Sequence, residues 1–310
     1  MPDAEEILNV HVVVSEASHD FFEYQLGNYV ETAARPGRLF FYCYALDEPT
    51  CDRYRSDRRL SLCAPVYANP RAYRRKSWND WKVFLRAMLM RRPALGGSNG
   101  HAAGLNHAGG VFARIAGHNI IADVDTVMLE RGWDEHTVAL LAEYDLFGAP
   151  YEDIAGFSSG DSKVQTYKAF ACAVWVALAA RVDFGAVDWM PAKERNVAID
   201  SEELSRIYGL PVGYELVRDV GWELPGFVHA RGLRHLALKH VKPSSPDCLV
   251  IRTGFDYNEE YQLEGAAMLA HHRGGSRIAL RGNEMSNAFF DRVEEHLGRR
   301  PGTGGAGPQR

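Results

Sequence analysis

The strongest constraint on the fold is the alternation of short apolar runs with helical patterns near the start of the chain. The valine-rich run at residues 8–15 has polar flanks and predicts a buried strand. A helical pattern at 21–34 ends at Arg35-Pro36-Gly37, and the aromatic run at 39–46 predicts a second strand. This order predicts an α/β domain with a mostly parallel sheet and helices on both faces.

The alternation continues along the chain. We expect one domain over residues 1–297, followed by a disordered Gly/Pro-rich tail at 298–310. The expected helices lie at 78–89, 101–115, 133–144 and 201–209, and the expected strands at 119–122, 146–149, 168–178, 214–217, 227–230 and 249–253.

Composition narrows the possible partners and compartments. The 310 residues carry a net charge of −5, which gives no general attraction to nucleic acid or anionic lipid. The longest apolar stretch, at 169–180, is shorter than the roughly 20 residues that cross a bilayer, and residues 1–14 lack the pattern of a signal peptide. Five dispersed cysteines without a C-x-x-C pair indicate neither a zinc cluster nor a disulfide framework. We therefore expect a cytoplasmic protein without an integral membrane segment and without a nucleic-acid partner.

Two carboxylates stand at the end of a predicted internal strand. Asp123 and Asp125 directly follow the apolar run at 119–122, so a turn there can direct both side chains at one cation. Oxygen ligands suit Mg²⁺ or Mn²⁺, which keep positions open for substrate phosphates. A D-x-D pair alone is weak evidence, because a chain of this length holds on the order of one by chance. The plain alternative is a solvated turn or a helix N-cap.

The surroundings of this pair resemble a known family. The stretch GSNGHAAGLNHAGGVFARIAGHNIIADVDTVMLERGWD (97–134) holds a small-residue helix, an apolar strand, the Asp pair, a second apolar run and Gly132-Trp133. It resembles the donor-binding core of GT-A glycosyltransferases of the family-2 type, and the resemblance covers residues 10–134. It implies a three-layer α/β/α fold with a donor-binding half at about 7–150 and an acceptor half at about 151–297.

The resemblance also implies an activity. A sugar would pass, with inversion, from a nucleotide-diphosphate donor to a hydroxyl or amine of an unknown acceptor, either a small molecule or a glycan. A UDP-sugar is favoured, although Ser15-Glu16 stands where the family usually has Pro-x-Asn/Tyr, which leaves the base open. Asp125, with Asp123, would hold Mn²⁺ or Mg²⁺. The residues implied around the donor are Ser15, Asp47, His101, Gly104, Asp123 and Arg273.

The late segment LAHHRGGSRIALRGN offers a further ligand. Family members often supply a histidine to the metal from a loop that covers the phosphates, which implies His272 here, with His271 as the alternative. Imidazole binds manganese-like ions, and the guanidinium of Arg273 would pair with the diphosphate. A surface turn with two solvated histidines is the plain alternative. A second histidine cluster, at 229, 235 and 240, is spaced too irregularly to name a ligand.

The acceptor side requires a general base. Asp200 precedes a predicted helix in AIDSEEL, which resembles the D-[ST]-x opening of the acceptor-side helix in some inverting enzymes. The nearest substitutes are Glu194, Glu202 and Glu203. The plain alternative is an acidic residue that pairs with the helix dipole.

Two other classes of protein stay open. A nucleotidyltransferase also joins an α/β sheet to Asp-bound magnesium, but it usually carries a Gly-rich basic loop after the first strand, and residues 15–20 have no Gly, Lys or Arg. A non-catalytic nucleotide-sugar-binding homologue would keep the fold without a base.

Overall fold

The computed structural model describes residues 6–66, 98–112, 115–150, 174–192, 196–253, 258–272 and 284–299. Five sequence predictions lie outside these ranges: the helix at 78–89, the first part of the strand at 168–178, the placements of Glu194 and Arg273, and the tail from residue 300 onward.

A seven-stranded sheet forms the centre of the molecule. Its strands, in order across the sheet, are β10 (His235–Ala237), β6 (Leu146–Gly148), β7 (Trp175–Leu178), β4 (His118–Ala122), β1 (Leu8–Val14), β2 (Leu39–Ala45) and β3 (Leu60–Pro65). Neighbouring strands are parallel except β7, which runs antiparallel to both β4 and β6. All seven residues of β1 are buried, as its valine-rich run predicts for a central strand.

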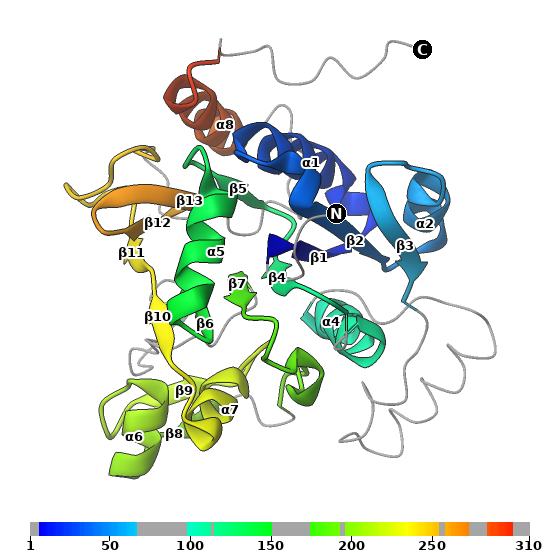
Figure 1. The fold of residues 1–310 in the computed structure, drawn as a ribbon. Coiled ribbons are helices and arrows are strands. Elements are labelled where there is room, and N and C mark those ends of the chain that lie inside the picture. The colour runs from blue at the N-terminus through cyan, green and yellow to red at the C-terminus, as the bar shows by residue number, and fades with distance from the viewer. Residues whose placement is uncertain are drawn as a thin grey trace.

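Helices cover both faces of this sheet. Figure 1 shows α1 (His19–Thr32) and α4 (Ser98–Phe112) on opposite sides of β1, β2 and β4. The other helices described between residues 6 and 150 are η2 (Glu16–Ser18), η3 (Pro36–Arg38), α2 (Glu48–Tyr54) and α5 (Trp133–Glu143). The predicted α/β fold, with helices on both faces of a mostly parallel sheet, is confirmed.

A second sheet, antiparallel and four-stranded, joins the first at the Asp pair. Its strands, in order, are β11 (Lys239–Val241), β12 (Asn258–Leu263), β13 (Ala266–His272) and β5 (Thr126–Met128). One face packs on α8 (Glu284–His296) in a hydrophobic cluster that includes Val127, Ala270 and Phe289. Because β5 begins directly after Asp125, the turn that holds the Asp pair connects the two sheets.

A third, smaller unit follows η5 (Phe184–Ala186). It contains the two-stranded sheet of β8 (Asn196–Ala198) and β9 (Glu215–Val217), together with α6 (Glu202–Tyr208) and α7 (Leu224–Arg231). As the sequence predicts, the Ser201 side chain caps α6 by accepting from Leu204 N–H, and Gly209 ends the helix with φ of 65°. In the described ranges, no helix combines the length and apolar character that crossing a membrane requires.

Two predicted strands are wrong. Residues 227–230 belong to helix α7, which has Pro225 in its first turn and is closed by Gly232 at φ of 60°. Residues 249–253 form no strand, because the N–H groups of Leu249, Val250 and Ile251 all donate to the carboxylate of Glu260 instead of to a neighbouring strand. In both segments a short apolar run did not determine the backbone conformation.

Candidate metal centre

The Asp pair lies at the carboxyl end of β4. The strand ends at Ala122, and Asp123 N–H donates to Val174 O at 2.7 Å, which extends the pairing with the β7 side by one residue. The chain then turns, and Thr126 N–H and Oγ1 both donate to Asp123 O. Ligands in open α/β sheets bind beyond the carboxyl ends of the strands, so the pair occupies the expected edge.

Helix α1 holds this turn through buried polar side chains. Gln25 Nε2 donates to Asp123 O at 2.7 Å and to Thr126 Oγ1 at 2.8 Å. The hydroxyl of Tyr29 lies 2.9 Å from the same Oγ1. These contacts satisfy the backbone of the turn from the protein interior, which leaves both carboxylates available to a ligand.

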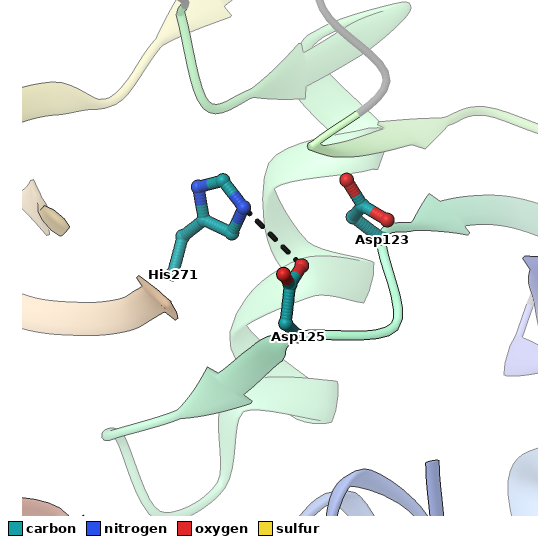
Figure 2. A group of neighbouring side chains, drawn as sticks. All are labelled: Asp123, Asp125 and His271. Atoms are coloured by element: carbon teal, nitrogen blue, oxygen red, sulfur yellow. Dashed lines mark ion pairs between the residues drawn. The ribbon is translucent and has the colours of Figure 1, made fainter. Parts of the chain in front are cut away.

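Strand β13 brings a histidine to the pair. It runs antiparallel to β5 with His271 opposite Thr126, and His272 N–H donates to Asp125 O at 2.9 Å. This register sets His271 Nε2 3.2 Å from Asp125 Oδ1 (Figure 2). One ligand atom from each of Asp123, Asp125 and His271 lies within 4.8 Å of the other two.

The three side chains fit a divalent cation. Asp125 is 4% exposed, and its Oδ1 has the ion-pair contact with His271 Nε2 at 3.2 Å but no hydrogen bond of regular geometry, although a buried carboxylate oxygen is normally satisfied. Two carboxylates and one imidazole form a donor set for ions such as Mn²⁺ or Mg²⁺, and three protein ligands leave coordination positions open. Asp123, Asp125 and His271 are therefore a group that can hold a metal ion.

The ionisable side chains of this group change one another's pKa. Burial and the neighbouring Asp125 raise the pKa of Asp123. Burial alone would also raise the pKa of Asp125, but the charge and hydrogen bond of His271, together with the nearby His272, outweigh burial and lower that pKa. Burial would lower the pKa of His271, yet Asp125 and Glu259 together raise it to about 10. Without a metal, a proton on His271 therefore supplies the positive charge that the carboxylates require.

His272, the ligand favoured from the sequence, has different surroundings. Its ring stacks on Phe289 with centroids 5.0 Å apart, and its Nε2 lies 2.8 Å from Ser286 Oγ. Consecutive side chains of a strand point to opposite faces, so His272 faces α8 while His271 faces the Asp pair. The structure thus brings His271, the alternative, to the site.

His101 and Gly104 lie on α4, one turn apart. The side chain of His101 is close enough to Asp123 for its charge to lower the pKa of that carboxyl, and its buried Nε2 has no hydrogen-bond partner. A Cβ on Gly104 would lie 2.6 Å from Cγ2 of Val13, so this glycine allows α4 to pack closely on β1. Of the two predicted donor residues, only His101 offers a polar side chain to the site.

Ser15 and Asp47 stand at the carboxyl ends of β1 and β2. Asp47 caps α2 by accepting from Thr50 N–H at 2.9 Å, and its other oxygen accepts from Glu16 N–H at 2.7 Å. Ser15 N–H donates to Ser18 Oγ at 2.9 Å, and the hydroxyl oxygens of Ser15 and Ser18 lie 3.2 Å apart. Both side chains therefore help to shape the edge of the sheet that also carries the Asp pair.

Asp200 lies in the small unit, exposed and directly before α6. Figure 1 places α6 beside α7, on the other side of the molecule from β5, the strand that begins directly after Asp125. The structure brings Asp123, Asp125, His271 and His101 together, and it does not join Asp200 to them.

One buried partner of the site was not predicted from the sequence. Glu259 on β12 lies opposite His271 on β13, and its Oε2 is 2.8 Å from His271 Nδ1. The sequence NEEYQL has no motif character, and the contact depends on the pairing of two strands. The only available signal was the unusual density of polar residues in a segment between apolar runs.

Comparisons with known proteins find a solved structure of low similarity and no family. No protein-family model matches the chain, and no curated protein matches it. Among solved structures, residues 1–349 of S. aureus TarS in complex with UDP-GlcNAc align over 76% of this chain with a TM-score of 0.36 and 10% sequence identity. The match spans 62% of that TarS chain.

Proposed function

We propose that this protein is a metal-dependent glycosyltransferase that moves a sugar from a nucleotide-diphosphate donor, with a UDP-sugar favoured, to an acceptor hydroxyl or amine. The proposal is carried by one observation: ligand atoms of Asp123, Asp125 and His271 converge within 4.8 Å of one another at the carboxyl edge of the central sheet. The chain resemblance over residues 10–134 agrees with this placement.

The residues of the site have separate roles in this proposal. Asp125 and His271 hold Mn²⁺ or Mg²⁺ together with Asp123. When bound, such an ion stabilises the negative charge that gathers on the departing nucleotide diphosphate. His101 borders the same carboxylates and is available to the phosphates or ribose.

Other residues are proposed to contact the nucleoside, the diphosphate and the acceptor. Ser15 and Asp47 stand at the ends of the two neighbouring strands, where a nucleoside would lie beside the metal-bound diphosphate. We assign Arg273 to the diphosphate. The acceptor half, at about 151–297, would supply the general base that takes the acceptor proton with inversion. Asp200, the candidate from the sequence, would fill this role only if the small unit approached the metal group.

The test is a panel of UDP-, GDP-, dTDP- and CDP-sugars, each incubated with the protein with and without Mn²⁺. We expect one of them to be hydrolysed slowly, with water taking the sugar in place of the acceptor, and to release its nucleoside diphosphate in a metal-dependent reaction that Asp125→Asn abolishes. The matched control is Asp183→Asn, which removes the carboxylate of an exposed turn outside the site. Release of pyrophosphate from a nucleoside triphosphate would instead identify a nucleotidyltransferase. Metal-dependent binding of a donor without any turnover would identify a non-catalytic homologue.

A further inference from the structure

The second sheet carries a buried polar network on the face that meets the Asp pair. His271 on β13 lies opposite Glu259 on β12, and Tyr261 follows two residues later on the same face of β12. His240 on β11 lies opposite Tyr261. The adjacent strands β11, β12 and β13 thus contribute polar side chains to one network that contacts His271, the candidate metal ligand.

We propose that Glu259 is a positioning residue that fixes the ring orientation and tautomer of His271, so that Nε2 is the nitrogen offered to a metal. This inference rests on the proposed metal centre. Glu259 Oε2 accepts a hydrogen bond from Nδ1 at 2.8 Å, which places the ring proton on Nδ1. The other nitrogen, Nε2, is the one that faces Asp125 at 3.2 Å. Carboxylates that hold metal-binding histidines in this way also raise the basicity of the ligand.

The Glu259 carboxylate is itself held in place. Tyr261 OH donates to Oε2 at 3.1 Å, and His240 Nε2 lies 3.4 Å from Oε1. The side chain of Glu259 is 3% exposed. A buried carboxylate is costly unless several partners compensate for its lost hydration, so this network fixes one position for the acceptor of His271.

The next residue of β12 provides a matched control. Glu260 is also a buried carboxylate, but it faces the opposite side of the strand and accepts from the N–H groups of Leu249 and Val250 at 3.0 and 2.7 Å. Its contacts are purely structural. A Glu→Gln change at position 259 or 260 therefore removes the same charge from the same strand, with contact to His271 in only one case.

The experiment measures Mn²⁺ affinity of the full chain by electron paramagnetic resonance, beside the melting temperature. We expect Glu259→Gln to weaken Mn²⁺ binding by about 10- to 100-fold, the usual effect of losing such a partner. Glu260→Gln should lower the melting temperature and leave Mn²⁺ affinity per folded molecule unchanged. Unchanged affinity in Glu259→Gln, or an equal loss in both variants, overturns the positioning role.

A second measurement needs no metal. In the proton NMR spectrum of the histidine ring N–H groups, the Nδ1 proton of His271 should give a downfield resonance that exchanges slowly with water. Glu259→Gln should shift this resonance upfield, and Glu260→Gln should leave it in place. An unshifted resonance overturns the inference. If the wild type and Asp125→Asn bind Mn²⁺ equally, the proposed metal centre is wrong. If Asp125→Asn alone loses the ion and Glu259→Gln does not, only the role of Glu259 is wrong.

Discussion

At the scale of single residues, two adjacent histidines have opposite surroundings. His271 faces Asp125, and His272 packs between α8 and Phe21, with ring centroids 5.6 Å apart for the latter pair. We expect His271→Ala to lose most Mn²⁺ affinity. His272→Ala should keep that affinity but lower stability by about 2 kcal/mol or more, because it empties a buried site. Loss of Mn²⁺ affinity in His272→Ala alone would return the ligand role to His272.

The proton on His271 makes metal binding dependent on pH. Its pKa of about 10 in the metal-free protein means that Mn²⁺ has to displace a proton at neutral pH. Affinity should therefore rise with pH, by up to about tenfold per unit between pH 6 and 9. Calorimetry at pH 7 in buffers of different ionisation enthalpy should show release of about one proton in the wild type and none in His271→Ala. If Mn²⁺ affinity did not change with pH, the metal would not displace a proton from His271.

The sequence predicts part of the site because part of it is local. Asp123 and Asp125 are two residues apart at the end of an apolar strand, so their convergence follows from the sequence. The choice between His271 and His272 depends on whether the segment is a loop or a strand, and here it is the strand β13. Glu259 was not predicted because its contact with His271 depends on strand pairing.

At the scale of elements, the close approach of α4 to β1 depends on one glycine. A Cβ at Gly104 would lie 2.6 Å from Cγ2 and 2.8 Å from Cγ1 of Val13, a side chain with a stiff χ1. Gly104→Ala should lower the free energy of unfolding by about 1–3 kcal/mol through overpacking. Gly27→Ala in α1, where a Cβ has no neighbour within 4 Å, should raise it by about 0.5–1 kcal/mol. Urea unfolding measures the free energy of unfolding of both variants. If Gly104→Ala raised this free energy, α4 would have to lie farther from β1 than it does here.

Elements with a strong apolar period were predicted well. The sequence placed β1, β2, β4, α1 and α5 within a few residues of their bounds in the structure. The failures fall on short runs and on buried polar strands. Residues 227–230 became helix α7, and β12 carries buried Asn258, Glu259, Glu260 and Gln262, a composition that local propensity does not assign to a strand.

At the scale of the whole molecule, a buried histidine in the central sheet links stability to pH. His11 on β1 lies 2.8 Å from Tyr44 OH and 3.0 Å from Asn119 Oδ1, and burial lowers its pKa to about 4. The unfolded chain takes up a proton below pH 6.5, whereas the folded chain does so only near pH 4. The stability from neutral His11 is therefore complete above pH 6.5 and is lost as the pH falls toward 4.

This loss has a measurable slope. One proton contributes about 1.4 kcal/mol per pH unit to the free energy of unfolding in this window. His272, whose pKa burial also lowers to about 4, adds a similar dependence. Urea unfolding at pH 6 and pH 5 should show that His11→Gln flattens the slope by about one proton relative to the wild type. Equal slopes in the two proteins would contradict the burial of a neutral His11.

The proposed function requires that Asp123, Asp125 and His271 bind the metal through which a nucleotide diphosphate is held. The most direct measurement is the shift in melting temperature caused by UDP, GDP, dTDP and CDP, each with and without Mn²⁺, in the wild type and in Asp125→Ala. A ligand that binds the folded state raises the melting temperature by mass action. We predict that one nucleotide stabilises the wild type only when Mn²⁺ is present, and that Asp125→Ala removes this metal-dependent increase. A nucleotide shift of the same size without Mn²⁺, or in Asp125→Ala with it, would contradict the account.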